Sequence, residues 1–185
     1  MEVGPRGSFT PWLEQKYVSI TNTDFDLRFP KKWSDYTEQF DLIVAMEVLE
    51  HINEPISNRS KMSEIDCFRE TGARNLLEGM LSASMKGGFL FLTTPNGASI
   101  EQIRKAVNGY TPIDYKLHVR EYGWKEVVNL VKESGWSIDQ VECIDCYEKF
   151  STQAELDERK ILRSKLSIPG QKLGRTAFVL AHKPA

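Results

Sequence analysis

One segment constrains the fold of this chain more than any other. It opens with seven mostly apolar residues, Phe40 to Met46, in the order FDLIVAM. A short, continuous apolar run with β-branched residues is typical of a strand that is buried on both faces of a sheet. Glu47, Glu50 and His51 follow at once. We therefore expect a buried strand that delivers two carboxylates and an imidazole to one end of a sheet.

Helix-like and strand-like patterns alternate along the rest of the chain. Apolar residues recur at helical spacing over residues 65–81, and we expect Gly87-Gly88 to end that helix. A second buried strand is predicted over residues 89–94. A second amphipathic helix, over residues 124–134, follows before a glycine. Alternation of this kind favours a parallel sheet with right-handed crossover connections.

The C-terminal third adds two further predicted strands, over residues 138–144 and 176–182. A charged helix lies between them, and Thr152-x-x-Glu155 has the spacing of a capping box at its start. Because this connection has no clear apolar helix face, we expect the last strand to be an antiparallel edge strand. The predicted fold class is α/β, a mostly parallel sheet with helices on both faces, in a single domain over residues 1–185.

Composition and charge narrow the class of protein. The chain is 41% hydrophobic and has a formal net charge of -2, which excludes disordered, collagen-like and coiled-coil chains. The charge balance gives no general attraction to nucleic acid or to an anionic membrane. Three cysteines are an odd number for a chain of 185 residues, and no apolar run is long enough to span a membrane. We expect a cytoplasmic protein without membrane or nucleic-acid partners.

The start of the chain carries a glycine pattern, EVGPRGS, at residues 2–8. Gly4 and Gly7 would let the backbone approach a ligand closely, although such a pair alone is also common in simple turns. Asp24 and Asp26 follow about 20 residues later, a separation suited to accepting hydrogen bonds from ribose hydroxyls. Either aspartate would equally suit a loop. Both interpretations stay open for this segment.

Taken together, these motifs resemble the class I S-adenosylmethionine-dependent methyltransferases over nearly the whole chain. EVGPRGS is similar to a reduced form of that family's glycine-rich motif, and FDLIVAMEVLEHI is similar to its fourth-strand motif. Residues 86–96 resemble the fifth strand with its preceding Gly-Gly turn, and residues 117–122 resemble the segment that follows. The resemblance implies a Rossmann-like domain. Two features depart from it: the usual leading helix and part of the first strand are missing, and residues 17–40 are short for a second crossover.

The resemblance also implies a cofactor site and an activity. S-adenosylmethionine would be the cofactor, and its methyl group would pass to an oxygen or nitrogen of a small molecule or glycan. Gly4 and Gly7 would approach its methionine part, Asp24 the ribose, and Phe25 and Asp26 the adenine. The residues implied to bind the cofactor are Glu2, Gly4, Pro5, Arg6, Gly7, Asp24, Phe25, Asp26, Met46 and Glu47.

Glu50, His51 and His118 are the candidate catalytic residues. An imidazole titrates near neutral pH, so either histidine would serve as a base for the acceptor. With Glu47, the set also resembles the Glu/Glu/His/His quartet with which small-RNA 2'-O-methyltransferases bind a divalent metal. In other relatives the same residues line the pocket or cap a helix. The sequence leaves the use of a metal open.

Two alternatives to small-molecule or glycan methylation remain. One is an RNA 2'-O-methyltransferase with that metal site, and the other is a non-catalytic remnant that has lost cofactor binding. A shortened N-terminal half would leave an apolar face for a second copy of the chain, which makes a homodimer an expected partner. The basic cluster of residues 159–165 alternates with acidic residues, so we interpret it as a solvated helix face, with nucleic-acid binding as the alternative.

Overall fold

The computed structural model describes residues 1–4, 10–16, 19–23, 25–28, 30–52, 71–146, 151–166 and 172–185. The strands are β1 (Glu2–Val3), β2 (Phe40–Met46), β3 (Ser84–Pro95), β4 (Ser137–Ile144) and β5 (Thr176–His182). The helices are α1 (Thr10–Lys16), α2 (Pro30–Trp33), α3 (Thr71–Ala83), α4 (Ile100–Val107), α5 (Trp124–Glu133) and α6 (Gln153–Leu166), with the 3-10 helices η1 (Ser34–Tyr36) and η2 (Leu49–His51). The predicted α/β class is confirmed. Among the described helices, none has the length and hydrophobicity needed to cross a bilayer.

The five strands form one sheet in the order β1-β2-β3-β5-β4. β1, β2 and β3 pair in parallel, and β5 is antiparallel to both β3 and β4. The antiparallel C-terminal strand is confirmed, but its expected position at the edge was wrong, because β4 lies outside it. β4 carries the exposed polar side chains of Asp139, Gln140 and Glu142, which suit a sheet edge better than the more apolar β5 does.

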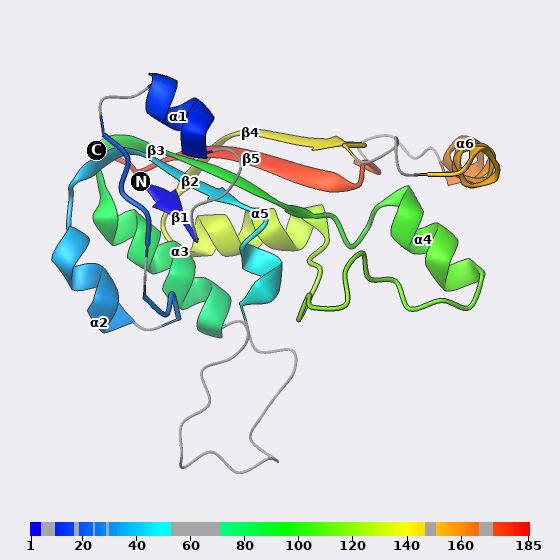
Figure 1. Cartoon of the computed structure of the whole chain (residues 1–185), viewed down its shortest axis with the longest axis horizontal. Helices are drawn as coiled ribbons and strands as arrows, with labels where there is room; N and C mark the ends of the chain where they lie inside the picture. Colours follow the sequence, from blue (N-terminus) through cyan, green and yellow to red (C-terminus); the bar gives the residue numbers. More distant parts are fainter. Residues whose placement is uncertain are drawn as a thin grey trace, which may run out of the picture.

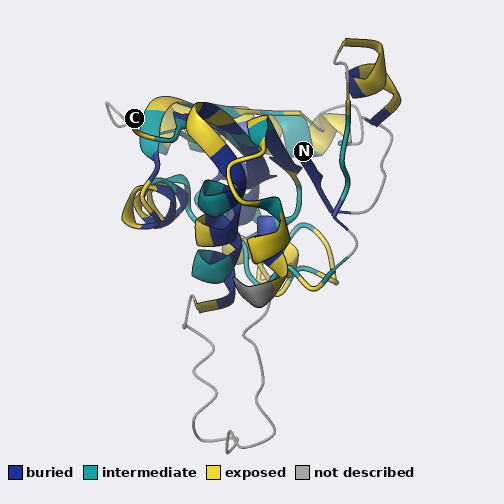
Figure 2. Ribbon diagram, turned by 90° about the vertical axis from the view of Figure 1, so that its left-hand side faces the viewer, coloured by how far each residue is buried: buried dark blue, intermediate teal, exposed yellow. Residues whose placement is uncertain are grey.

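The core lies between the sheet and two helices. In β2, Ile43 and Ala45 are fully buried and pair with Leu90 and Leu92 of β3. Helices α3 and α5 lie against one face of the sheet, and the shorter α1 lies over the other (Figure 1). The buried side chains of α3 and α5 include Leu76, Leu77, Met80, Val127, Leu130 and Val131. Figure 2 shows buried residues concentrated in this layer, as the amphipathic patterns predict.

Gly87-Gly88 has a different structural role from the predicted one. Helix α3 already ends at Ala83 and β3 begins at Ser84, so the two glycines lie inside the strand. The β2–β3 register shifts at this point, and Gly87 has a φ of 72°. A positive φ is readily adopted by glycine, so the pair allows an irregular strand rather than ending a helix. The part of the predicted helix before residue 71 lies outside the described residues.

The sheet brings the segments that carry the polar motifs to one edge. Val3 pairs with Ala45, and Met46 pairs with Thr93, so β1, β2 and β3 have their carboxyl ends together. β5 runs the other way, and its amino end joins the same edge. Ligands of open α/β sheets bind beyond the carboxyl ends of the parallel strands. The candidate site therefore lies at this edge.

The packing of α3 on α2 gives a stability prediction. A Cβ at Gly79 would overlap the indole ring of Trp33, which is 1% exposed. Helix propensity alone would make Gly79→Ala more stable by about 1 kcal/mol. Because the added methyl group would overlap this buried ring, we expect a net loss of roughly 1–2 kcal/mol in the free energy of unfolding measured with urea. Glu78→Ala, on the exposed side of α3, is the control, and a gain for Gly79→Ala would contradict this packing.

Candidate active site

The turn after β2 is held by β3. Glu47 has a φ of 54°, in the left-handed region that residues with a side chain seldom adopt. Its N–H donates to the carbonyl oxygen of Thr93 at 2.9 Å, and its Oε1 accepts from Thr93 Oγ1 at 2.8 Å. The short 3-10 helix η2 starts two residues later, at Leu49. Such strained residues cluster at functional sites.

The carboxyl group of Glu50 is the most buried polar group of this corner, with no exposed surface. Its Oε2 accepts a hydrogen bond from Thr94 Oγ1 at 2.8 Å. Its Oε1 is buried and has no hydrogen-bond partner among the described residues. Burial is the main cause that raises the pKa of Glu50 to about 7, and the negative charge of Glu47 adds to it. The group therefore titrates near neutral pH.

The two predicted catalytic histidines lie beside this carboxyl group. His51 Nε2 and His118 Nε2 are each 3.9 Å from Glu50 Oε1. The imidazole rings meet edge to face, with their centroids 4.8 Å apart. The structure thus brings together Glu50, His51 and His118, the three residues predicted to be catalytic, although the two histidines are 67 positions apart in the sequence.

The other nitrogen of each ring has an acceptor. His118 Nδ1 is 2.6 Å from Glu121 Oε1, and His51 Nδ1 is 3.3 Å from the carbonyl oxygen of Leu117. Because a carboxylate and a carbonyl only accept, each Nδ1 is the donor, and each Nε2 keeps its lone pair in the neutral ring. Two imidazole nitrogens and one carboxylate oxygen within 4.8 Å of one another are a ligand set for a divalent cation.

The sequence analysis missed Glu121 as a functional residue. Its side chain is 2% exposed and, besides His118, it accepts hydrogen bonds from Gln102 Nε2 at 2.7 Å and from the N–H of Asp114. The one sequence signal for Glu121 is its position three residues after His118, within residues 117–122. The carbonyl oxygen of Glu50 accepts from the N–H of Val119 at 2.8 Å, which fixes this segment against η2.

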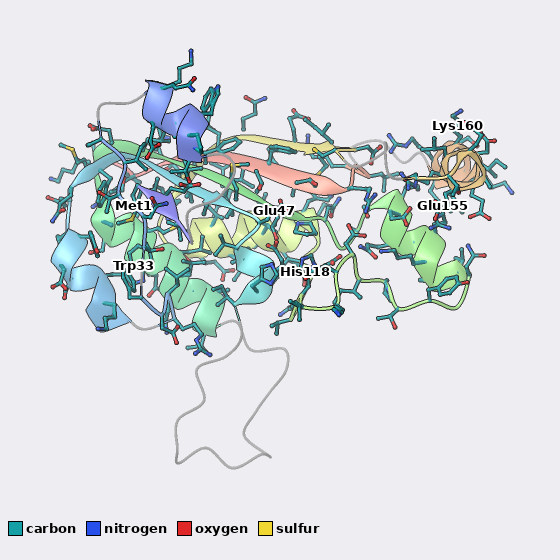
Figure 3. All side chains as sticks on the ribbon, viewed as in Figure 1. Met1, Trp33, Glu47, His118, Glu155 and Lys160 are labelled. Carbon is teal, nitrogen blue, oxygen red and sulfur yellow. The ribbon has the colours of Figure 1, made fainter. Side chains whose placement is uncertain are left out.

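A hollow of about 300 Å³ opens at this corner, and we call it the active-site hollow. It is lined by Glu47, Glu50, His51, Pro95, Asp114, Tyr115, His118, Arg175 and Thr176. Asp114 pairs with Lys105 at 2.7 Å and with Arg175 at 3.2 Å. The sequence analysis missed Asp114 and Arg175, because a pair separated by about sixty residues leaves no local signal. Figure 3 shows Glu47 and His118 at this corner.

The start of the chain reaches the same corner. Gly4 follows β1 with a φ of 107°, and its N–H donates to Thr23 Oγ1 at 2.8 Å. The β1–β2 register places Gly4 beside Met46, and a Cβ at Gly4 would lie 3.4 Å from Cγ2 of Val48. Met46 is partly exposed at the strand end. Gly4 itself is buried, so the positive φ and the bond to Thr23 fix the turn after β1 beside the end of β2.

Four of the residues assigned to the cofactor, Pro5, Arg6, Gly7 and Asp24, lie outside the described residues. Glu2 is buried, and its Oε2 accepts from Thr10 Oγ1 at 2.5 Å and from Asn22 Nδ2 at 2.8 Å. Glu2 thereby connects β1 to α1 and to the segment at residues 19–23.

Phe25 and Asp26 lie farther from the corner. The ring of Phe25 stacks on that of Tyr36, with the ring centroids 5.7 Å apart. The centroid of Tyr36 is in turn 6.1 Å from that of Phe40, at the amino end of β2. Asp26 is exposed and pairs with Arg28 at 2.6 Å, and these hydrogen bonds lower the pKa of its carboxyl group. The described residues thus do not bring Phe25 or Asp26 to Glu47, and their roles toward adenine remain predictions.

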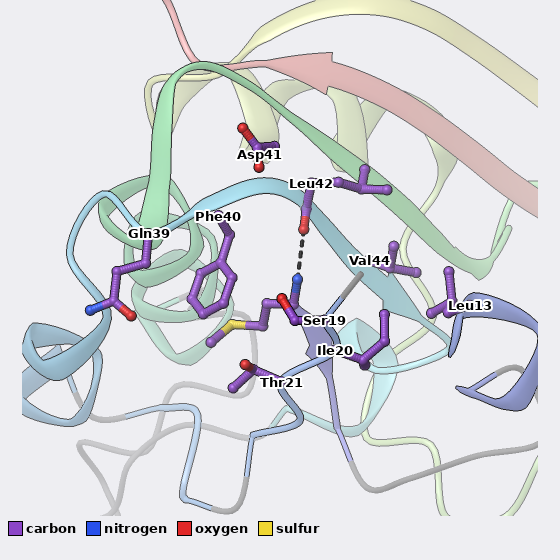
Figure 4. Close-up of a pocket in the computed structure, with 10 residues that line it drawn as sticks. Leu13, Ser19, Ile20, Thr21, Gln39, Phe40, Asp41, Leu42 and Val44 are labelled. Carbon is purple, nitrogen blue, oxygen red and sulfur yellow. Dashed lines mark hydrogen bonds between the residues drawn. The ribbon is translucent and has the colours of Figure 1, made fainter. Parts of the chain in front are cut away.

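A second hollow, of about 530 Å³, lies at the opposite end of β2 (Figure 4). Apolar side chains such as Leu13, Ile20 and Leu42 line much of it. The α-amino group of Met1 donates to the carbonyl oxygen of Leu42 at 2.7 Å beside it. Because it faces the amino ends of the parallel strands, it is not where a sheet of this kind binds its ligand.

Comparison with known proteins agrees with this geometry. Residues 1–141 match the model of a family described as a methyltransferase domain. A SAM-dependent methyltransferase from Archaeoglobus fulgidus has a similar structure, with a TM-score of 0.53 and 13% sequence identity, over 98% of this chain and 74% of that one. A protein of Bacillus halodurans, assigned as a methyltransferase, has a TM-score of 0.50 and 12% identity, over 96% of this chain and 78% of that one. At these identities the likeness is one of fold. None of the curated proteins matches this chain.

The burial of Glu50 predicts how stability depends on pH. Because the pKa of Glu50 is near 7 in the folded state and 4.5 in the reference state, the folded protein binds the extra proton. The stability that this proton contributes is fully present below pH 4.5 and is lost as the pH rises through 7. Over this range the free energy of unfolding falls by roughly 3 kcal/mol. Glu50→Gln should remove it, as measured by urea unfolding across this pH range. The exposed Glu78→Gln is the control, and identical pH profiles for Glu50→Gln and the unsubstituted chain would contradict the assignment.

Proposed function

Because this chain belongs to the methyltransferase-domain family, with S-adenosylmethionine as methyl donor, we propose that it methylates an oxygen or nitrogen of a small molecule or glycan in the active-site hollow. The observation that carries this proposal is the position of His118. Its Nε2 faces a buried carboxyl oxygen and lines a hollow beyond the carboxyl ends of the parallel strands. A base is thus directed into a space of suitable size for an acceptor group.

The residues around Gly4 are compatible with the cofactor. Gly4 turns the chain with a positive φ after β1, and the β1–β2 register places this turn next to Met46 at the end of β2. The cofactor supplies a methyl group on a sulfonium, which is activated toward displacement. Holding donor and acceptor in line can contribute about 7–11 kcal/mol, so positioning is the main task of these residues.

The acceptor loses a proton during the reaction, and the corner supplies two groups to receive it. His118 Nε2 would accept that proton during methyl transfer. Glu121, 2.6 Å from Nδ1, stabilises the imidazolium that results. Glu50 is buried with a pKa near 7 and faces the same space, so it is the second candidate base.

The cation ligand set supports a second candidate, an RNA 2'-O-methyltransferase. Glu50 Oε1 lacks a hydrogen-bond partner among the described residues, and two Nε2 atoms lie 3.9 Å from it. These donors fit Mn²⁺ or Zn²⁺, and a bound cation lowers the pKa of an acceptor hydroxyl. The net charge of -2 opposes a general affinity for RNA, so we place this candidate second.

Self-association and a cytoplasmic location belong to the same proposal. Trp12, Met85 and Phe89 are large apolar side chains that are 41–46% exposed. A second copy of the chain that covers them would remove this surface from water. Sedimentation velocity would show a dimer that Phe89→Ser weakens.

Cofactor binding is the first experimental check. We expect calorimetry to detect micromolar binding of S-adenosylhomocysteine by the unsubstituted chain. Gly4→Val should weaken it at least about tenfold, because φ is positive there and the side chain would fill the space beside Val48. Gly87→Val, at another positive φ but in open space inside β3, should leave the affinity unchanged. No binding by the unsubstituted chain would instead support a non-catalytic remnant.

The role of His118 is the second check. With an acceptor found from a panel of hydroxyl and amine compounds, we expect His118→Ala to lower kcat by roughly 100-fold or more while S-adenosylhomocysteine still binds. His182→Ala is the matched control, since His182 pairs with Asp139 on the far strands. Full activity in His118→Ala would contradict its role as base. Activity that a chelator abolishes and Mn²⁺ restores would favour the cation candidate.

A further inference from the structure

Helix α4 is linked to His118 through two buried side chains. Gln102 of α4 is 2% exposed, and its Nε2 donates to Glu121 Oε2 at 2.7 Å. The other oxygen of that carboxylate, Oε1, is 2.6 Å from His118 Nδ1. Because a carboxylate only accepts hydrogen bonds, the nitrogen is the donor in both contacts. The three side chains therefore form a continuous series of hydrogen bonds from a helix to the proposed base.

The Glu121 carboxylate has a donor on each oxygen. Besides His118 Nδ1, its Oε1 accepts from the backbone N–H of Asp114, and the side chain of Glu121 is 2% exposed. A rotation of this carboxylate would break a buried hydrogen bond that water is poorly placed to replace, which is costly. Gln102 thus holds Oε2 on one side and thereby sets the direction in which Oε1 points on the other.

Helix α4 is in turn fixed by α6. Glu101 Oε2 is 2.7 Å from Arg159 Nε of α6, and both side chains are 5% exposed. The predicted solvated face of α6 was therefore wrong for Arg159, which is buried where the two helices pack. Lys105 Nζ of α4 is also 2.7 Å from Asp114 Oδ1. Helix α4 thus holds the segment before α5 at two points, through Gln102 and Lys105.

Glu121 determines which nitrogen of the His118 ring carries the hydrogen. In a neutral imidazole one nitrogen is a donor and the other an acceptor, and Glu121 requires the donor at Nδ1. Nε2, which is 3.9 Å from Glu50 Oε1, then holds the lone pair. A base needs that lone pair to take a proton, and a nitrogen ligand needs it to bind a cation. The opposite tautomer would serve neither candidate function.

We propose that Gln102 and Glu121 are positioning residues for His118. Gln102 holds the Glu121 carboxylate in place, and Glu121 keeps the ring hydrogen of His118 on Nδ1, so that Nε2 is presented to the acceptor with its lone pair. This inference rests on the proposed function, in which His118 is the base. Neither residue belongs to the lining of the active-site hollow, and both therefore act through His118.

The first test observes the His118 ring by ¹⁵N-edited proton NMR of the free protein, under conditions in which the ring is neutral. The chain has three histidines, so comparison with His118→Ala assigns the signals. We expect an Nδ1–H signal that exchanges slowly with water, because this hydrogen bond is buried. Glu121→Met should abolish the signal. Gln102→Met, of similar size but without the donor, should speed its exchange at least about fivefold.

Gln140→Met, on the exposed edge strand β4, is the matched control and should change nothing. A ring hydrogen on Nε2 of His118 in the unsubstituted chain would overturn the proposal, as would equal exchange in Gln102→Met and Gln140→Met.

Glu121→Gln guards against a folding defect in Glu121→Met. Gln102 Oε1 has no hydrogen-bond partner among the described residues, so the Gln102 amide can turn and accept from the new Nε2 at position 121. The new amide oxygen then still accepts from His118 Nδ1, and we expect the Nδ1–H signal to persist. Its loss in Glu121→Gln would show that Gln102 does not set the orientation of residue 121, and would overturn the role of Gln102.

The second test measures turnover with a methyl acceptor. Glu121→Met should lower kcat by roughly 100-fold and Gln102→Met by roughly tenfold, with the KM for S-adenosylmethionine unchanged. Gln140→Met should keep full kcat. A higher KM without a lower kcat in Gln102→Met and Glu121→Met would overturn a positioning role. The NMR test needs neither cofactor nor acceptor, so a slowly exchanging Nδ1–H signal in a chain without methyl transfer would count against the proposed function alone.

Discussion

The burial of the Glu50 carboxyl group organises the functional edge of this molecule. Its Oε2 accepts a hydrogen bond from Thr94 Oγ1 of β3. The backbone carbonyl oxygen of Glu50 accepts a hydrogen bond from the N–H of Val119, in the segment before α5. Its remaining oxygen faces His51 and His118. Residues from three separate stretches of the sequence thus meet around a single group. The same burial raises the pKa of that group, so geometry and protonation have one cause.

The spacing around Glu50 Oε1 also limits what the corner can do. A distance of 3.9 Å to each Nε2 is too long for a hydrogen bond, yet short enough for one further atom to contact both groups. An acceptor hydroxyl and a divalent cation both satisfy this requirement. The choice between a general base and a cation is therefore a choice between two occupants of one space.

Strong local patterns explain which parts of the fold were predictable from the sequence. β2 and β5 have the predicted bounds, since each is a compact apolar run between polar residues. The placement of β5 inside the sheet was not predictable, because it depends on pairing with β3 and β4. The turn at Glu47 follows from hydrogen bonds to Thr93 on another strand, which override local helix propensity. His118 was found through family resemblance, whereas Glu121 and Arg175 needed the three-dimensional arrangement.

Charged residues were the hardest to interpret, because their environment is set by distant segments. Glu101 lies between two arginines where α4 contacts α6. Its Oε1 is 2.9 Å from Arg104 Nη2, and its Oε2 is 2.7 Å from Arg159 Nε. In the sequence, the charges of α6 alternate as they do on any solvated helix. Only docking against α4 buries one of them, Arg159.

The bond between the Glu50 carbonyl and Val119 links access to ionisation. A displacement of the segment before α5 that broke this bond would admit water to the carboxyl group. Hydration would return the acidity of Glu50 toward that of an ordinary glutamate, and closure would restore the protonated form. Admission of a substrate and release of a proton would then be two aspects of one motion.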